Sequence, residues 1–450
     1  MTRPTMTVTG TDAWVEALVA GLLRRHDRVW WLDGGAGRAW SGRASLVGWL
    51  ADDEPSLTYH AARREVVEHR GSTSTVVGDD LFGELRARLG TPDAPRRWFG
   101  WAGYAARADL PALTDPRTGH SGGGPPDACW LPGLRWVRVD HATGVVRRCP
   151  SGSADALDLD GAIVAQDPPA APIGVRVDAD WSATTYTVAF DRVQEALRAG
   201  HTYEVNLTYR HRMLGPRGVE AAWQAYRRLR QVSRAPYAGF VHHRGTSLLA
   251  ASPERFATVV DGGVETRPVK GTVARLPDPA ADAARAARLA SDPRTRAENL
   301  IVCDLLRNDV ATVSRPGSVR VPRLLEVETH PGLHQLVSTV QGCLADGVDA
   351  VEVLRLLLPG GSMTGAPKLR TMQVIQAVED TPRGVYAGAF GWLEADAADL
   401  GMVIRSWVHH EDAWTAGTGG GVTVLSDAVS EYDETRLKLD RLRTALGADV

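Results

Sequence analysis

The chain of 450 residues is poor in cysteine, lysine and phenylalanine, with only four, three and six of each. Four scattered cysteines exclude a disulfide framework or a Cys-x-x-Cys metal site, and they favour a reducing compartment. The sequence contains no run of about 18 apolar residues, which a membrane-spanning helix would need. Its first residues do not resemble a secretory signal. The net charge of −3 makes nucleic acid and anionic membranes poor partners. We therefore expect a cytoplasmic globular protein.

The scarcity of lysine is the most informative of these deficits. Lys270, Lys368 and Lys438 are the only lysines, so arginine supplies 48 of the 51 basic residues. A chain that uses arginine for ordinary surface charge keeps lysine where a compact charge or a nucleophilic amine is needed. Chance retention is the alternative for any one of them. The surroundings of each lysine must decide between the two.

The first part of the chain, residues 1–165, reads as an N-terminal α/β region. Residues 12–25 have the apolar spacing of an amphipathic helix, and residues 28–32 and 136–140 have the composition of strands. The stretch from 150 to 174 is polar and contains several prolines, which predicts a linker.

The second part, residues 178–450, is the predicted catalytic region. Ser182 is a plausible cap for a helix that ends near Gly200, and residues 203–208 read as a strand. Further strands and helices alternate irregularly to the C-terminus, without an internal repeat. Periodicity alone therefore predicts a mixed α/β protein.

Lys270 stands in the run ETRPVKGT, beside a glycine that lets a ligand approach the backbone. A free lysine with a pKa near 10.4 is a poor nucleophile at neutral pH, so we expect burial or nearby cations to lower its pKa. Upstream, Glu254 follows an apolar strand in the run SPERF and is a candidate general acid. The alternatives are an ordinary edge-strand lysine and a turn carboxylate paired with Arg255.

The run LPGGSMTGAPK, residues 358–368, predicts an anion-binding loop. Glycines and hydroxyls before a helix present backbone N–H groups, and Lys368 adds positive charge. The spacing differs from a Walker A loop, and a carboxylate suits the site as well as a phosphate. Arg405 offers a second grip, because its planar fork binds carboxylates with two hydrogen bonds. A plain glycine-rich turn is the alternative for the loop.

Acidic residues suited to Mg²⁺ occur in two places. Glu298 precedes the apolar face of a predicted helix over 300–309, and Glu431 and Glu434 share a helix face with Lys438 after three glycines. Carboxylate oxygens are ligands for this hard cation, so Glu434 and Glu298 are candidates to hold it together. The alternatives are a helix-dipole interaction for Glu298 and a surface ion pair between Glu434 and Lys438. The sequence thus offers two anion-binding features, carboxylates suited to Mg²⁺ and a candidate nucleophilic lysine. Together they indicate an enzyme that acts on a small polycarboxylate.

The runs SPERF, PVKGT, AEN…DLLRND, PGGSMTGAPK and GGG…SEYDET occur here in the order found in one known family. The sequence resembles the chorismate-utilising enzymes, which include anthranilate, isochorismate, salicylate and aminodeoxychorismate synthases. The resemblance is strong from Ser182 to Leu446 and weak in the run WFGWAGY, residues 98–104. It implies an α/β fold of the α+β type, with two packed, mostly antiparallel sheets flanked by helices.

Two positions divide the chemistries of that family. Members that add water to chorismate have a lysine base where this chain has Glu204, and anthranilate synthases have a small residue where it has Lys270. The resemblance therefore implies aminodeoxychorismate synthase component I, which serves p-aminobenzoate and folate or a related aromatic amine. Component I of an anthranilate or 2-amino-2-deoxyisochorismate synthase is the alternative within the class. A non-catalytic chorismate-binding homologue is the alternative outside it.

The resemblance also assigns roles to residues. Lys270 would attack C2 of chorismate while Glu254 protonates the departing C4 hydroxyl, and ammonia would then displace the lysine by attack at C4. Mg²⁺ would be held by Glu298 and Glu434, supported by Glu431. The substrate-binding set implied by the resemblance is Thr272, Ser362, Tyr386, Arg405, Gly419, Gly420, Gly421 and Lys438.

Some features depart from the family or are missing from the chain. Gln335, with His334 beside it, occupies a position where the family commonly has histidine, and Thr295 stands where an acidic residue is usual. None of the cysteines lies in the Gly-x-Cys-x-Gly setting of a glutaminase. Ammonia is therefore expected from solution or from a separate glutamine amidotransferase subunit.

Overall fold

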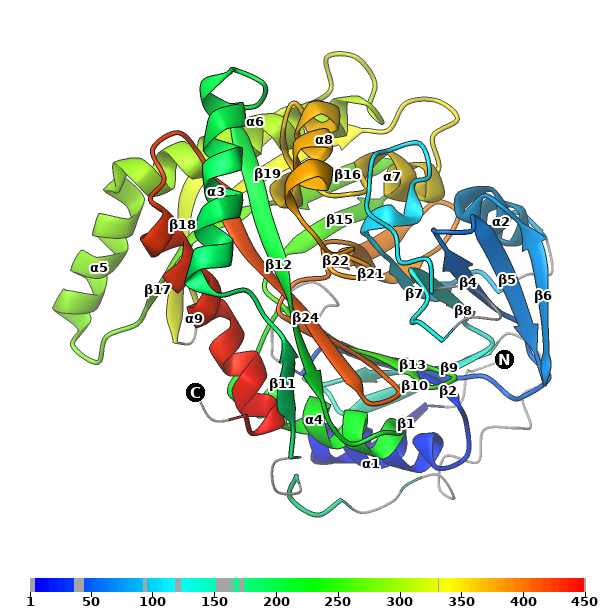
Figure 1. The fold of residues 1–450 in the computed structure, drawn as a ribbon. Coiled ribbons are helices and arrows are strands. Elements are labelled where there is room, and N and C mark those ends of the chain that lie inside the picture. Colours follow the sequence, from blue (N-terminus) through cyan, green and yellow to red (C-terminus); the bar gives the residue numbers. More distant parts are fainter. Residues whose placement is uncertain are drawn as a thin grey trace.

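The computed structural model describes residues 5–35, 44–91, 95–117, 123–150, 163, 166–169, 174–330 and 332–448. The described strands form two large sheets of twelve strands each. Within each sheet, all neighbouring strands are antiparallel. Helices lie outside the sheets (Figure 1). The expected fold class is therefore confirmed.

The first sheet runs through the centre of the molecule and carries the long strand pair β12–β24 (Figure 1). In spatial order its strands are β1 (Thr5–Thr7), β10 (Val145–Pro150), β9 (Arg135–Asp140), β3 (Ala44–Trp49), β2 (Arg28–Asp33), β13 (Tyr237–His243), β14 (Thr246–Ser252), β23 (Ser406–His410), β24 (Ala413–Val422), β12 (Glu204–Leu214) and β11 (Arg176–Ala179), with β20 (Gly365–Ala366) also paired to β12.

The second sheet begins at the strand that bears Lys270. In spatial order its strands are β17 (Val269–Ala274), β19 (Leu333–Cys343), β16 (Gly263–Arg267), β15 (Arg255–Val260), β22 (Ala398–Met402), β21 (Ala389–Leu393), β7 (Trp98–Ala102), β8 (Ala128–Pro132), β4 (Ser56–His60), β5 (Glu65–Arg70) and β6 (Thr73–Gly78), with β18 (Arg320–His330) also paired to β19.

The helices of the described chain are α1 (Thr11–Leu23), α2 (Leu81–Leu89), α3 (Ala183–Arg198), α4 (Val219–Val232), α5 (Pro279–Ser291), α6 (Pro293–Ala311), α7 (Ala350–Leu357), α8 (Lys368–Val378) and α9 (Ala428–Leu446). Within the described residues, each helix is too short or too polar to cross a membrane. Ser182 caps α3 as expected, because its hydroxyl accepts a hydrogen bond from the Thr185 amide at 3.1 Å.

The two sheets are joined by an aromatic core. Trp30 of the first sheet stacks on Phe99 of the second, with ring centroids 4.8 Å apart, and both rings are fully buried. Trp101, Tyr237 and Phe390 belong to the same cluster. A shared apolar layer of this kind fixes the two sheets face to face, because separating them would expose large aromatic surfaces to water.

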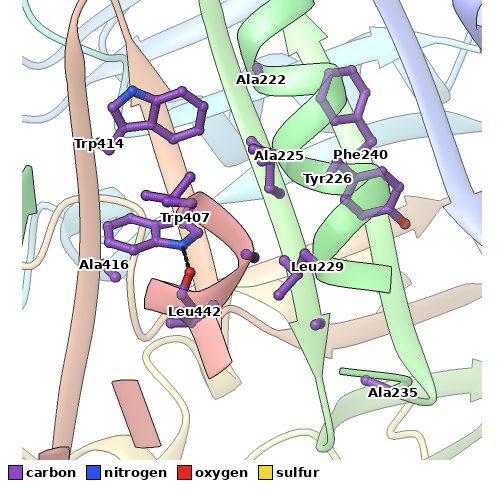
Figure 2. Packing of buried hydrophobic residues seen from close by; sticks show 14 of the residues in the cluster. Ala222, Ala225, Tyr226, Leu229, Ala235, Phe240, Trp407, Trp414, Ala416 and Leu442 are labelled. Carbon is purple, nitrogen blue, oxygen red and sulfur yellow. Dashed lines mark hydrogen bonds between the residues drawn. The ribbon is translucent and has the colours of Figure 1, made fainter. Parts of the chain in front are cut away.

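A second core lies under the helices that cover the first sheet. Figure 2 shows Trp407 of β23 and Leu442 of α9 side by side, and Tyr226 of α4 beside Phe240 of β13. The buried indole of Trp407 donates a hydrogen bond to the Leu442 carbonyl of α9 at 3.0 Å. That bond satisfies a polar group inside the core and fixes the position of α9, the helix that carries the candidate metal ligands.

Both sheets take strands from both predicted parts of the chain. Strands β1 to β3, β9 and β10 enter the first sheet, and β4 to β8 enter the second. The division into 1–165 and 178–450 stays a prediction, and most of the expected linker, 150–174, lies outside the described residues.

Candidate active site

Strands β12 and β24 form one wall of the site, where the three consecutive glycines Gly419–Gly421 of β24 lie opposite Asn206, Leu207 and Thr208. These glycines are needed for close approach. A Cβ at Gly421 would lie 2.3 Å from Glu204 Oε1, and one at Gly420 would lie 3.2 Å from Glu431 Oε2. The glycine run therefore leaves space in front of the wall that side chains would fill.

Lys270 approaches this wall from β17, and its Nζ lies 3.5 Å from Glu204 Oε1. The following residue, Gly271, has φ +87°, a conformation that favours glycine. Burial lowers the pKa of Lys270, but Glu204, Glu298 and Glu254 outweigh burial and hold this pKa above its ordinary value. The expectation of a lowered pKa is therefore wrong, because the amine is surrounded by carboxylates.

Glu254 is buried, with 7% of the residue exposed, and accepts a hydrogen bond from Ser362 Oγ at 2.7 Å. Burial raises the pKa of this carboxyl, while the Ser362 hydrogen bond and the charge of Lys270 act in the opposite direction. Arg255 turns away and pairs with Glu265. Glu254 lies in a turn but is not paired with Arg255, as the alternative required, and its raised pKa suits a proton donor.

The three predicted metal ligands lie near one guanidinium. Arg294, on α6, donates to Glu298 Oε1 at 3.0 Å and to Glu431 Oε1 of α9 at 2.7 Å. Burial and the neighbouring Glu434 raise the pKa of Glu431, against the influence of Ser426 and Arg294. Within the described residues, no three acidic, histidine or cysteine side chains gather closely enough to form a metal-binding group.

Lys438 links α9 to the glycine wall. Its Nζ donates to the Gly419 carbonyl at 2.8 Å and lies 2.8 Å from Glu434 Oε1. Burial raises the pKa of Glu434, but Lys438 outweighs this effect and the pKa lies below its ordinary value. The surface ion pair considered from the sequence is present, and it borders the site.

A cationic group and an aromatic ring lie on a further side of the site. The guanidinium of Arg405 makes no hydrogen bond or ion pair within the described part of the chain, and burial lowers its pKa. Tyr386 is buried against Gly417, and Arg210 lies over its ring at 4.9 Å. An unpaired, half-buried guanidinium is a binding group for an anion.

The loop that precedes α8 differs from its expected role in one respect. Lys368 Nζ lies 2.9 Å from the buried Asp309 Oδ2, so its charge is already paired. Ser362 lies in a 3₁₀ turn, Gly361–Met363, whose position is fixed where Asn206 donates to the Ser362 carbonyl at 2.7 Å. The loop therefore orients Ser362 toward Glu254, and Lys368 supports the fold.

The residues at the unusual histidine position point in opposite directions, as neighbours in a strand do. His334 Nε2 contacts Asp282 Oδ1 of α5 at 2.9 Å. Gln335 donates to Thr272 Oγ1 at 3.5 Å, which sets Thr272 at the exposed margin of β17. His334 is a structural residue, and Gln335 contacts Thr272 on the strand that bears Lys270.

Sequence reasoning missed the roles of two residues in this site. Glu204 served only to exclude water addition, whereas its carboxylate is the hydrogen-bond partner of Lys270. Arg294 drew no attention among 48 arginines, although it bridges two candidate metal ligands. A cavity of about 520 Å³ lies elsewhere, beside the C-terminal end of α1, and none of the predicted site residues lines it.

Comparison with known proteins decides the family. The model of the family described as chorismate binding enzyme matches residues 39–444. This chain belongs to the chorismate binding enzyme family. The match includes Lys270, Glu254 and the acidic residues on α6 and α9.

Relatives within this family carry two kinds of name. An aminodeoxychorismate synthase of Streptomyces pristinaespiralis is 37% identical over 99% of this chain and 64% of its own length. An aminodeoxychorismate synthase component 1 of Klebsiella aerogenes is 41% identical over 59% of this chain and 58% of its own. An anthranilate synthase component 1 of Streptomyces coelicolor is 33% identical over 89% and 84%. The chain thus spans about three fifths of the length of the aminodeoxychorismate synthases.

Solved structures of the family share the fold. Anthranilate synthase component I from Streptococcus pneumoniae superposes with a TM-score of 0.73 at 23% identity, covering 90% of this chain and 93% of its own. The menaquinone-specific isochorismate synthase of Escherichia coli superposes with a TM-score of 0.72 at 18% identity, covering 99% of this chain and 95% of its own. At these identities the likeness concerns the fold alone.

Proposed function

We propose that this chain is the chorismate-converting component I of an aminodeoxychorismate synthase. It would convert chorismate and ammonia to 4-amino-4-deoxychorismate through a covalent adduct on Lys270. The observation that carries the proposal is the Lys270 amine beside the glycine wall, close enough to the buried carboxyl of Glu254 for the two charges to interact. Relatives named aminodeoxychorismate synthase support it.

The reaction consists of two allylic displacements. The Lys270 nitrogen bonds to C2 as the ring double bond shifts and the C4–O bond breaks, and Glu254 protonates the hydroxyl, which leaves as water. Ammonia then bonds to C4 as the double bond shifts back and the C2–N bond breaks, which frees Lys270. The raised pKa of Glu254 supports its role, because burial favours the protonated, uncharged form of the carboxyl.

The two substrate carboxylates need cationic partners. The unpaired guanidinium of Arg405 and the amine of Lys438 are suited to this role, with Tyr386 and the backbone of Gly419–Gly421 beside them. Binding the anions there would orient the ring between Lys270 and Glu254. Charge pairing of this kind contributes specificity because the partners are largely removed from water.

The carboxylates of Glu298, Glu431 and Glu434 would hold Mg²⁺. The donor set fits, because it consists of oxygen ligands and two of the three already converge on one cation, the Arg294 guanidinium. The side chain of Arg294 is 57% exposed, so water would solvate its guanidinium if Mg²⁺ displaced it. When bound, Mg²⁺ supplies positive charge that neutralises a substrate carboxylate.

Ammonia would come from a separate glutamine amidotransferase subunit. The name component 1 carried by the Klebsiella relative supports a second component. The anthranilate synthase relative from Streptomyces coelicolor, which matches more of its own length, favours a second candidate function, amination at C2.

Mass spectrometry of the product separates these functions. Purified protein with chorismate, Mg²⁺ and ammonium should yield 4-amino-4-deoxychorismate, which an added lyase converts to p-aminobenzoate. Anthranilate would support the second candidate, and no turnover would support a non-catalytic homologue.

Variants of Lys270 test the nucleophile itself. Lys270→Ala should abolish amination at C4 or redirect it to C2, and Lys270→Arg, which keeps the charge but has no nucleophilic amine, should also lose the C4 product. Unchanged formation of 4-amino-4-deoxychorismate by either variant contradicts the adduct.

A further inference from the structure

The amine of Lys270 meets one carboxylate at hydrogen-bond range. Its Nζ lies 3.5 Å from Glu204 Oε1, and only 3% of Glu204 is exposed. The second oxygen, Oε2, is buried without a hydrogen-bond partner among the described residues. Gly421 keeps the space beside the pair open, because a Cβ there would lie 2.3 Å from Oε1 and 3.3 Å from Nζ. The Glu204 carboxylate is therefore buried in direct contact with the Lys270 amine.

Four carboxylates act on Lys270, each from a different part of the fold. They are Glu204 of β12, Glu254 of the turn between β14 and β15, Glu298 of α6 and Glu434 of α9. Their charges outweigh burial and hold the pKa of the amine above its ordinary value. The resting side chain is therefore an ammonium, which has no lone pair and cannot attack carbon. A proton must leave before the reaction starts.

Only one of these carboxylates is placed to take that proton. Glu254 is hydrogen-bonded by Ser362 and is already assigned to the leaving hydroxyl, Glu298 is bound by Arg294, and Glu434 is bound by Lys438. Within the described residues, Glu204 is the one carboxylate that is hydrogen-bonded to Nζ.

We propose that Glu204 is the catalytic base that deprotonates Lys270 for attack on C2. The inference rests on the proposed lysine adduct and adds the residue that creates the nucleophile.

The protons balance over one cycle. The Lys270 ammonium gives a proton to the Glu204 carboxylate, and the free amine forms the C2–N bond while Glu254 protonates the departing hydroxyl. Ammonia then forms the C4–N bond, and lysine leaves as an amine. The new ammonium at C4 returns a proton to Glu254, and Glu204 returns its proton to Lys270. Chorismate and ammonia thus give the aminated product and water.

Glu204→Gln tests the proposal, because it keeps the shape of the side chain and removes the base. The measurement is the single-turnover rate of adduct formation on the full chain with chorismate and Mg²⁺ but without ammonia, followed by intact-protein mass spectrometry. We expect a rate about 100-fold below wild type at pH 7, rising steeply toward pH 10 as solvent hydroxide replaces the base. Glu204→Asp, which restores a carboxylate, should recover part of the rate at pH 7.

The opposite result has a physical meaning of its own. If Glu204 only stabilised the Lys270 ammonium, it would reduce the fraction of free amine and slow the reaction. Its removal would then lower the pKa of Lys270 and speed adduct formation. A Glu204→Gln variant as fast as wild type, or faster, with an unchanged pH profile overturns the proposal. A wild-type chain that aminates chorismate without carrying any adduct overturns the lysine mechanism itself. The two failures are distinguished by whether the wild-type mass increases.

Discussion

Replacing Glu379 should destabilise the protein more than replacing an exposed charge, because this buried carboxylate pairs with two buried guanidiniums. Its side chain is 2% exposed and accepts hydrogen bonds from the amide and the hydroxyl of Thr208, both at 2.9 Å. Arg383 binds it through two nitrogens at 2.6 and 3.0 Å, and Arg210 lies 3.4 Å away. Glu379→Gln keeps the size of the side chain but leaves two buried guanidiniums without a counter-charge.

The expected loss is about 3–5 kcal/mol, the cost of breaking a buried ion pair by removing one partner. An entropy of unfolding of about 2.1 cal/mol/K per residue over 450 residues amounts to about 0.9 kcal/mol/K. The midpoint of thermal unfolding, Tm, should therefore fall by about 3–5 °C. Scanning calorimetry measures this shift, and tryptophan fluorescence reports the same transition.

An exposed ion pair provides the matched control. Asp304 and Arg307 form a pair on α6 with side chains 66% and 54% exposed, so Asp304→Asn should change the free energy of unfolding by less than about 1 kcal/mol. Arg383 also donates to the carbonyls of Met363 and Asn206, so Glu379→Gln should weaken chorismate binding as well. Equal Tm values for the two variants would refute the reasoning.

Two further predictions concern protons and metal. Burial lowers the pKa of His242 and His409 to about 4, so between pH 6.5 and 4 the unfolded chain binds protons that the folded chain does not. Each histidine should thus lower the free energy of unfolding by up to about 3 kcal/mol as the pH falls through that range. The measurement is Tm as a function of pH, compared between wild type and the double variant His242→Gln, His409→Gln. Arg294→Gln removes the guanidinium that competes for Glu298 and Glu431, so calorimetric titration should give Mg²⁺ binding about 2- to 20-fold tighter.

Each of these has a clear contrary outcome. Identical profiles for wild type and the double histidine variant would mean that neither ring is held neutral by burial. For the metal, Arg307→Gln on the same helix is the control, since its partner Asp304 is exposed. An Arg294→Gln variant that binds Mg²⁺ no better than Arg307→Gln would show that the guanidinium and the metal do not share the site.

The sequence predicted residues whose chemistry is local, and it predicted least well those whose role depends on a distant neighbour. The rarity of lysine and the run SPERF pointed to Lys270 and Glu254, because residue type and flanking pattern are visible in one dimension. The neutralisation of Lys368 depends on Asp309, 59 positions earlier on another helix, and no spacing rule connects them. The pKa of Lys270 was misjudged for the same reason, since its carboxylates come from four separate elements.

The fold was predicted as a class, through the family resemblance, but not in its strand order. Alternating apolar residues indicate that a strand exists and which face it buries. They do not identify the partner strand, because many strands of similar length and composition compete for each edge. The pairings of β2 with β13 and of β7 with β21 join segments far apart in the chain, so pattern alone could not have found them.

Those distant pairings have a consequence for synthesis on the ribosome. Trp101 pairs with Phe390, and Trp31 with Phe240. The strands β7 and β2 find an early partner on one edge, in β8 and β3, but the other edge stays unpaired until much later parts of the chain emerge. At about 5–20 residues per second, β7 waits roughly 15–60 seconds for β21. During that interval a tryptophan-rich strand edge is exposed to solvent, which makes the nascent chain a natural client of chaperones that shield apolar segments.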